Sequence, residues 1–207
     1  MRTPDFIYFD LGNVLLHFDH DVCCREVGRV AGIDAAAVRK AMFASGLGDR
    51  YETGAITSDQ FHEEFCQIAG APCSREEMML AVSDIFWLNS GMAPVVAQLA
   101  AAGHPLGILS NTCDVHWRWV TDGRYRMLPG RFQKFALSFE IGAMKPQPAI
   151  YEAAARLAGV APEKIFFVDD RPENVAGALA AGYDAVPFTS SWKLAADLQA
   201  RGVKFNF

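Results

Sequence analysis

Three carboxylates, one hydroxyl and one ammonium stand at positions of the sequence where they could do chemistry together. Each follows an apolar run, directly or after a short loop, and the residues are Asp10, Ser110, Lys145, Asp169 and Asp170. In an open parallel α/β sheet, ligands bind beyond the carboxyl ends of the strands. We therefore expect these side chains to converge at one edge of such a sheet.

This set of groups suits phosphoryl transfer, in which a protein mainly supplies positioning and charge stabilisation. Asp10 and Asp170 come from separate strands and can hold Mg²⁺, because this ion prefers hard oxygen ligands. The other oxygen of Asp10 can attack phosphorus and form an aspartyl-phosphate that water then hydrolyses. Ser110 and backbone N–H groups would bind the phosphoryl oxygens, and Lys145 would offset the clustered negative charge.

The apolar runs are nearly continuous, which is typical of strands buried on both faces of a parallel sheet. The sequence predicts strands at Phe6–Phe9, Pro105–Leu109, Phe135–Phe139, Lys164–Val168 and Asp184–Phe188. Helical patterns lie between the later runs, each before a glycine suited to a left-handed cap: Met92–Ala102, Ala149–Ala158, Glu173–Ala181 and Trp192–Arg201. The expected fold class is therefore α/β, a three-layer, doubly wound parallel sheet.

Residues 17–89 interrupt this alternation. The sequence predicts only helices there and no strand, over Val22–Val30, Ala35–Ala44, Ser58–Ile68 and Arg75–Trp87. Ser58 and Ser74 are expected as helix N-caps, the second in a capping box with Glu77. We expect a small helical domain over 17–89, inserted after the first strand of a core domain formed by 1–16 and 90–207. The core of the insertion is expected to contain its large aromatic residues, Phe61, Phe65, Phe86 and Trp87.

The composition of the chain indicates which kinds of partner and which cellular compartment to expect. The 207 residues carry a net charge of -5 with no run of Lys or Arg, which argues against nucleic acid. The five cysteines lack a Cys-x-x-Cys pair, which argues against a disulfide framework and against a zinc site. The first apolar run is too short for a signal peptide or a membrane span. We expect a cytoplasmic protein without membrane contact, a monomer or weak homodimer that acts on a small molecule.

Four segments resemble, in order, the motifs of the haloacid dehalogenase-like (HAD) hydrolases. They are Phe9–Val14, Leu109–Thr112, Lys145–Pro146 and Phe167–Asn174. The sequences Asp-Leu-Gly-Asn-Val and Ser-Asn-Thr within these motifs are similar to those of a bacterial branch of the superfamily that includes α-D-glucose-1-phosphate phosphatase. The helical insertion resembles the cap domain of the same superfamily, so the resemblance covers most of the chain.

The resemblance implies a role for each motif residue. Asp10 would be the nucleophile and a Mg²⁺ ligand, with the Gly12 carbonyl and Asp170 as further ligands. Asp169 and Asn174 would support the metal from behind. Catalysis would also use Ser110 and Lys145, and the substrate phosphate would contact Gly12, Asn13, Ser110, Asn111 and Lys145. The implied activity is a Mg²⁺-dependent phosphatase for a small phosphorylated metabolite, with sugar phosphates as the favoured class.

Gly12 departs from the family pattern. Most HAD phosphatases carry an aspartate at this position, which protonates the leaving group and later activates water. Proton transfer of this kind contributes roughly 10²–10⁴-fold in rate, so the glycine implies a slow enzyme, a substitute group or an undemanding leaving group. His17, His20 and His116 could supply the substitute, but the sequence does not place any of them.

The sequence also allows other roles for the insertion and other activities. Four residues of the insertion could reach the polar end of a substrate, although a solvated helical face is the simpler interpretation: Arg25, Arg29, Arg50 and Tyr51. A 2-haloacid dehalogenase is the nearest rival activity. Such enzymes resemble Phe-Asp-x-Tyr-Gly-Thr at the first motif and generally lack the fourth-motif metal ligand, whereas this chain has Gly12 and keeps Asp170. A third reading is a catalytically weak, phosphate-binding protein of the same fold.

Overall fold

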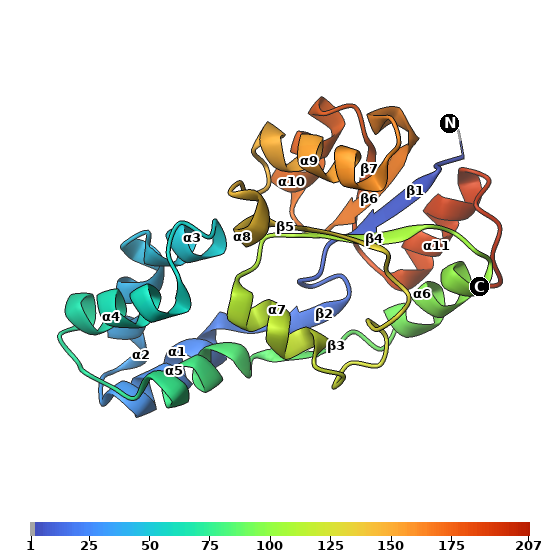
Figure 1. Ribbon diagram of the computed structural model, residues 1–207. Coiled ribbons are helices and arrows are strands. Elements are labelled where there is room, and N and C mark those ends of the chain that lie inside the picture. The colour runs from blue at the N-terminus through green and yellow to red at the C-terminus, as the bar shows by residue number, and fades with distance from the viewer. Residues whose placement is uncertain (1–2) are drawn as a thin grey trace.

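A five-stranded parallel sheet lies at the centre of the core, in a computed structural model that describes residues 3–207. Met1 and Arg2, which belong to the predicted core domain, lie outside the described residues. The strand order is β5-β4-β1-β6-β7, and Figure 1 shows β1 between its two neighbours. The bounds are β1 Phe6–Phe9, β4 Leu106–Ser110, β5 Lys134–Leu137, β6 Ile165–Asp169 and β7 Asp184–Pro187.

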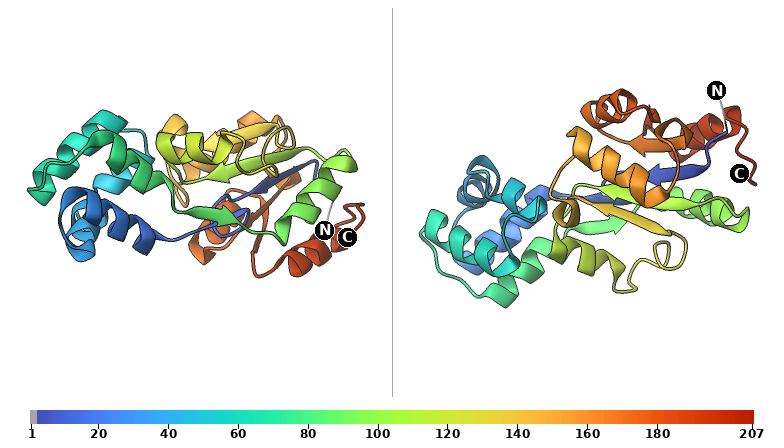
Figure 2. Two further views of the ribbon diagram at one scale, coloured as in Figure 1. Left: turned by 90° about the horizontal axis from the view of Figure 1, so that it is seen from below. Right: turned by 45° about the horizontal axis from the view of Figure 1, so that its top comes forward.

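Alternating side chains of each strand face opposite sides of the sheet, and helices cover both sides. Ile7 and Phe9 pack with α6 (Met92–Ala101), α7 (Asp114–Thr121) and α11 (Ser191–Ala200). Phe6 and Tyr8 pack with α9 (Pro148–Ala158) and α10 (Pro172–Ala180) on the other side. The views in Figure 2 show the same sandwich from below and tilted forward. The predicted three-layer, doubly wound fold is confirmed.

Several strands and helices begin or end at other residues than the sequence predicts. The strand expected at Phe135–Phe139 ends at Leu137, because Ser138–Ile141 form the short helix α8, capped by Gly142 with φ of 78°. A single 3₁₀ turn, η2 (Pro162–Lys164), leads into β6. The glycines predicted to end the long core helices all have positive φ: Gly103, Gly159, Gly182 and Gly202.

The helical insertion has a hydrophobic core of its own. Its elements are α1 (His20–Ala31), α2 (Ala35–Arg39), the π-helical turn η1 (Lys40–Ala44), α3 (Leu47–Glu52), α4 (Ser58–Ala69) and α5 (Arg75–Ser83). Figure 1 shows them beside the carboxyl end of the sheet. Phe61 and Phe65 are buried in this second core, as predicted. Ser74 caps α5 as predicted, whereas the N-cap of α4 is Thr57 and not Ser58, because Thr57 completes a capping box with Gln60.

The prediction that residues 17–89 contain no strand is wrong. β2 (Leu16–Phe18) pairs antiparallel with β3 (Phe86–Leu88), so the chain entering the insertion lies beside the chain leaving it. The helix expected to reach Trp87 therefore ends at Ser83. Trp87 is half exposed and lies outside the core of the insertion, whereas Phe86 packs against the cores of both parts.

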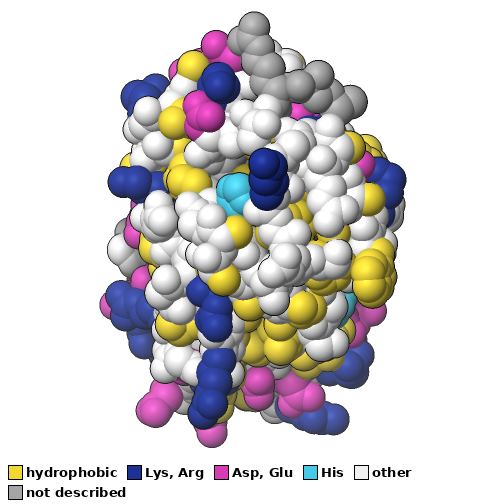
Figure 3. All heavy atoms as spheres, turned by 90° about the vertical axis from the view of Figure 1, so that its right-hand side faces the viewer, with side chains coloured by type: hydrophobic (Ala, Val, Ile, Leu, Met, Phe, Trp, Pro, Cys, Tyr) yellow, Lys and Arg dark blue, Asp and Glu magenta, His cyan; other side chains and the backbone are white. Residues whose placement is uncertain are grey.

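The outer surfaces carry charges of both signs. On the face nearest the C-terminus, Lys and Arg side chains alternate with Asp and Glu around a group of hydrophobic ones (Figure 3). Trp192, which is 73% exposed, packs against the C-terminal residue Phe207. Within residues 3–207, the helices are all too short or too polar to cross a membrane.

Packing of the central sheet predicts a large difference between two phenylalanines on strands. Phe166 lies fully buried on β6, whereas Phe135 is 39% exposed on the edge strand β5. Phe166→Ala should lower the free energy of unfolding by about 3–5 kcal/mol through the lost contacts and the cavity it leaves. Phe135→Ala should cost about 1 kcal/mol or less. Urea denaturation of both variants checks this, and equal losses would contradict the packing described.

Candidate active site

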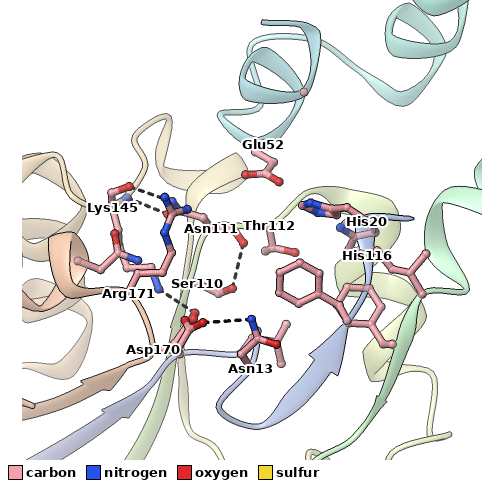
Figure 4. Close-up of a pocket in the computed structure, with 18 of the residues that line it drawn as sticks. Asn13, His20, Glu52, Ser110, Asn111, Thr112, His116, Lys145, Asp170 and Arg171 are labelled. Atoms are coloured by element: carbon pink, nitrogen blue, oxygen red, sulfur yellow. Dashed lines mark hydrogen bonds and ion pairs between the residues drawn. The ribbon is translucent and has the colours of Figure 1, made fainter. Parts of the chain in front are cut away.

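A pocket of about 240 Å³ lies between the carboxyl edge of the sheet and the helical insertion (Figure 4). The core contributes the loops after β1, β4 and β6 and the loop before α9. The insertion and its connecting strands contribute Phe18, His20, Phe43, Glu52 and Phe86. The predicted convergence is therefore observed, since Asp10, Ser110, Lys145 and Asp170 all line this one cavity.

The Lys145 ammonium connects three strand ends. Its Nζ donates to Asp10 Oδ1 at 2.7 Å, to Asp169 Oδ2 at 2.6 Å and to the Leu109 carbonyl at 3.0 Å. The side chain is only 1% exposed. Burial disfavours the charged amine, yet the attraction of Asp10 and Asp169 outweighs it and raises the pKa of Lys145. The lysine is therefore a fixed cation at neutral pH.

Asn111 holds the backbone of Lys145 in place. Its Oδ1 accepts from the Lys145 N–H at 2.7 Å, and its Nδ2 donates to the Lys145 carbonyl at 2.9 Å. The sequence predicted Asn111 as a substrate contact, and it does line the pocket. Because both the oxygen and the nitrogen of its amide group are bonded to the Lys145 backbone, Asn111 positions Lys145.

The two adjacent aspartates at the end of β6 have different surroundings. Asp169 is fully buried and accepts from Lys145 Nζ, Asn174 Nδ2 and the Arg171 N–H. Asp170 is less buried, faces the pocket and accepts from Asn13 Nδ2 at 3.0 Å. Asp170 is thus the one with oxygen left for a ligand, a distinction that spacing alone could not make.

The carboxylates form an oxygen cluster that needs a cation. Oxygens of Asp10, Asp169 and Asp170 lie within 4.8 Å of one another, and Lys145 is the ammonium that contacts the cluster. Burial raises the pKa of Asp10 above its ordinary range, and Asp169 adds to this while Lys145 opposes it. Asn174 Oδ1 is buried beside them with no hydrogen-bond partner among the described residues. Hard oxygen donors with one unsatisfied neighbour fit Mg²⁺ and its water shell.

Gly12 and Asn13 form the tight turn after β1. Asn13 has a φ of 55°, which asparagine tolerates better than most residues. A Cβ at Gly12 would lie 2.7 Å from Cε1 of Phe18, at the point where β2 brings this ring over the turn. Packing therefore favours glycine here, because any larger residue, an aspartate included, would have to displace the Phe18 ring.

The three histidines considered as proton donors have distinct positions. His20 and His116 line the pocket, whereas His17 packs against Trp87 and is not among the lining residues. Burial lowers the pKa of His116 to about 4, and its Nε2 contacts the Val82 carbonyl at 3.1 Å. Burial also lowers the pKa of His20. Both rings are therefore neutral near pH 7, and neither offers an imidazolium proton to a leaving group.

The other insertion residues named from sequence do not enter this pocket. Arg29 pairs with Glu26 and Arg50 with Glu64 on the surface, and Arg25 is exposed. Tyr51 is buried, with its hydroxyl 2.7 Å from Ser58 Oγ and its ring stacked on Phe61. The solvated-face interpretation therefore holds for the arginines.

Glu52 is a pocket residue that the sequence did not reveal. It ends α3, and its carboxylate projects from the insertion into the cavity, opposite the wall that carries Ser110 and Asp170 (Figure 4). Its carbonyl accepts from Ser138 Oγ at 2.6 Å, which anchors it to the core. Burial raises the pKa of Glu52 to about 7, helped by Asp49 and opposed by Arg171 and Lys145. No motif marks such a residue, because only the packing of α3 brings it here.

Residues 5–182 match the family described as haloacid dehalogenase-like hydrolase. This match covers most of the chain and includes all the strand ends that build the pocket. The chain belongs to the haloacid dehalogenase-like hydrolases. The membership agrees with the order of motifs and with the lysine–carboxylate centre described above.

Three similar proteins extend this comparison. D-ribitol-5-phosphate phosphatase from Bacteroides thetaiotaomicron is 24% identical over 174 residues, which span 82% of this chain and 84% of the relative. A HAD family enzyme from the same organism, solved with magnesium and inorganic phosphate, is 25% identical with a TM-score of 0.78, covering 89% of this chain and 94% of that one. A predicted HAD-like hydrolase from Porphyromonas gingivalis is 23% identical with a TM-score of 0.79, covering 96% and 98%.

The contact between Gly12 and Phe18 yields a stability prediction. Gly12→Ala should lower the free energy of unfolding by about 1–3 kcal/mol, because the added methyl forces the packed ring to move. Phe18→Leu removes the ring atom that collides. In the double variant the cost of Gly12→Ala should shrink, giving a favourable coupling in a double-mutant cycle by urea denaturation. Strict additivity of the two losses would count against this account of the glycine.

Proposed function

We propose that this chain is a Mg²⁺-dependent phosphomonoesterase that acts on a small phosphorylated sugar or sugar alcohol. One observation carries the proposal. The buried carboxylate of Asp10 accepts a hydrogen bond from the Lys145 ammonium and belongs to a cluster of three carboxylates suited to a divalent cation. The named phosphatase relative and the magnesium–phosphate complex of a structural neighbour support the same reaction class.

The proposed Mg²⁺ ligands are Asp10, Asp170 and the Gly12 carbonyl. Asp169 accepts hydrogen bonds from Lys145 and Asn174, so it would position these neighbours of the metal site without binding the ion itself. When bound, the ion supplies charge neutralisation for the phosphate and, on the order of several kcal/mol, stabilises the transition state. Asn13 steadies Asp170 through its side-chain amide, and Asn174 offers its unsatisfied Oδ1 to the surrounding water.

Asp10 is the proposed nucleophile. One oxygen of its carboxylate would attack phosphorus while the other stays with the metal, and Lys145 fixes the carboxylate through its contact with Oδ1. The bond between phosphorus and the ester oxygen breaks as the aspartyl-phosphate forms, and water then attacks this phosphorus to release phosphate and restore Asp10. Ser110 and the Gly12 N–H would bind oxygens of the transferred phosphoryl group, while Lys145 offsets its charge. The Asn13 N–H is already engaged, since it donates to the Leu16 carbonyl at 2.6 Å.

Proton transfer is assigned to Glu52. Gly12 has no acid to offer, and the pocket histidines are neutral, whereas a carboxyl with a pKa of about 7 is matched to both halves of the reaction. Protonated Glu52 would give its proton to the departing alkoxide. The resulting carboxylate would then take a proton from the water that attacks the aspartyl-phosphate, which returns Glu52 to its starting form.

Two features argue against the alternative readings. A haloacid dehalogenase attacks carbon and needs no metal, yet this site clusters oxygens of Asp10, Asp169 and Asp170. Lys145 contacts Asp10 and Asp169, whereas Asp170 accepts from Asn13 and keeps an oxygen for a metal ion. A protein that only binds phosphate would have no use for a nucleophile kept in register with a proton carrier across the cavity. The apolar wall formed by Phe18, Phe43 and Phe86 suits the carbon face of a small metabolite.

The metal and the nucleophile can be tested together. Phosphate release from a panel of pentose, hexose and sugar-alcohol phosphates should require Mg²⁺ and stop on addition of EDTA. Asp10→Asn should lower kcat at least about 10³-fold, since the amide cannot form the acyl phosphate. Asp59→Asn, an exposed aspartate of the insertion, is the matched control and should leave kcat unchanged. Turnover that survives both EDTA and Asp10→Asn would overturn the proposal, and halide release from 2-chloropropionate would favour the dehalogenase.

The role of Glu52 predicts an effect that depends on pH and on the leaving group. With an alkyl phosphate, the protonated form is needed first, so kcat should fall as pH rises through about 7. Glu52→Gln should lower kcat roughly 10²–10⁴-fold and remove this pH dependence. Burial is the main cause of the raised pKa of Glu52, and the charged groups that modify it, Asp49, Arg171 and Lys145, stay in place in the variant.

p-Nitrophenyl phosphate separates the two halves of this reaction, because p-nitrophenolate needs no proton to leave. The Gln variant should release one equivalent rapidly and then turn over slowly, as water attack lacks its base. Glu63→Gln, an exposed glutamate on α4, should behave like the wild type. An unchanged pH profile in Glu52→Gln would refute the assignment of Glu52 and leave that of Asp10 intact.

A further inference from the structure

A second group of metal-ligating side chains lies on the helical insertion, away from the active-site pocket. We propose that His62, Cys66 and Cys73 form a binding site for Zn²⁺. This site is independent of the proposed phosphatase centre, since none of the three residues lines that pocket. It joins α4 to the segment that leads into α5, at the end of the insertion remote from the sheet (Figure 1).

Local structure brings the three side chains together. His62 and Cys66 are four residues apart on α4, so they project from the same face of the helix. The helix ends at Gly70, whose positive φ of 63° turns the chain back. Cys73 then returns to that face, with its carbonyl 2.9 Å from His62 Nε2. The ligand atoms of the three side chains lie within 4.8 Å of one another, and on binding a metal Nε2 would exchange its contact with this carbonyl for the ion.

The distances match a tetrahedral metal site. Cys66 Sγ lies 3.5 Å from His62 Nε2 and 3.8 Å from Cys73 Sγ. A tetrahedral Zn²⁺ with bonds of about 2.0–2.1 Å to nitrogen and about 2.3 Å to sulfur requires separations of about 3.6 Å and about 3.8 Å. Cys66 is therefore spaced from His62 and from Cys73 as the ion requires, and binding would break the contact between His62 Nε2 and the Cys73 carbonyl.

The donor set selects the kind of metal. One imidazole and two thiolates suit Zn²⁺, whereas Mg²⁺ requires oxygen ligands. The side chains are partly exposed, which leaves an entry path, and Met78 Sδ lies 3.9 Å from Cys73 Sγ on the buried side. Three protein ligands leave a fourth position for water. Binding releases the two thiol protons, and the imidazole keeps its proton on Nδ1.

The sequence argued against a zinc site because the cysteines do not form a Cys-x-x-Cys pair. In the structure, His62 and Cys66 are instead brought together by their i, i+4 spacing on a helix, and Cys73 follows seven residues after Cys66. Such a site would stabilise the junction of α4 and α5. Its expected consequence is a more stable insertion, with no direct part in phosphate chemistry.

Co²⁺, a spectroscopic substitute for Zn²⁺, provides the test on the reduced, full-length protein. One equivalent should produce a thiolate-to-cobalt charge-transfer band that persists in excess Mg²⁺ and disappears when Zn²⁺ is added. Zn²⁺ should also raise Tm. Asp10→Asn should keep the band, which separates this site from the active-site pocket.

Variants identify the ligands. Cys66→Ser, Cys73→Ser and His62→Ala should each lose the band and the Zn²⁺-dependent rise in Tm. Cys24→Ala, at a buried cysteine elsewhere in the insertion, should keep both. A reduced wild-type protein without the band would overturn the proposal, and so would a band that survives Cys66→Ser and Cys73→Ser. Formation of a Cys66–Cys73 disulfide in air, without any band in the reduced protein, would identify a redox pair in place of a metal site.

Discussion

The arrangement of the active site depends on one buried ammonium. Lys145 Nζ contacts a carboxylate at the end of β1, another at the end of β6 and a carbonyl on β4. Burying a carboxylate without a partner is costly, so the two aspartates tolerate their positions only while this cation lies between them. The loop that carries Lys145 is in turn fixed by Asn111 from the end of β4. Four separate segments are thus held in register by electrostatics at a single point.

This centre was the most predictable part of the molecule. Its carboxylates stand at or just beyond the ends of buried strands, and the parallel topology brings such positions to one edge. Lys145 follows the edge strand β5 only after the short helix α8. The alternation of strands and helices likewise indicated the sandwich. The choice between Asp169 and Asp170 was not accessible in this way, because it depends on which carboxylate Asn174 and Lys145 already occupy.

The features missed from sequence all depend on contacts between distant segments. β2 and β3 have three residues each and are far apart in the chain, so neither carries a periodic signal of its own. Glu52 reaches the pocket only through the packing of α3, with its carbonyl held by Ser138. The reason for Gly12 is also a tertiary one, since Phe18 arrives from the paired strand and fills the space above it.

The pairing of β2 with β3 bears on how the insertion moves. Two separate linkers would allow it to swing and twist in many directions. Linkers that are hydrogen-bonded side by side form a ribbon, which bends across its flat face more readily than it shears or separates. Phe18 and Phe86 sit on this ribbon and also line the pocket. Any flexing of the ribbon would therefore move Phe18 and Phe86 and change the shape of the cavity, so the position of the insertion and the shape of the pocket are mechanically coupled.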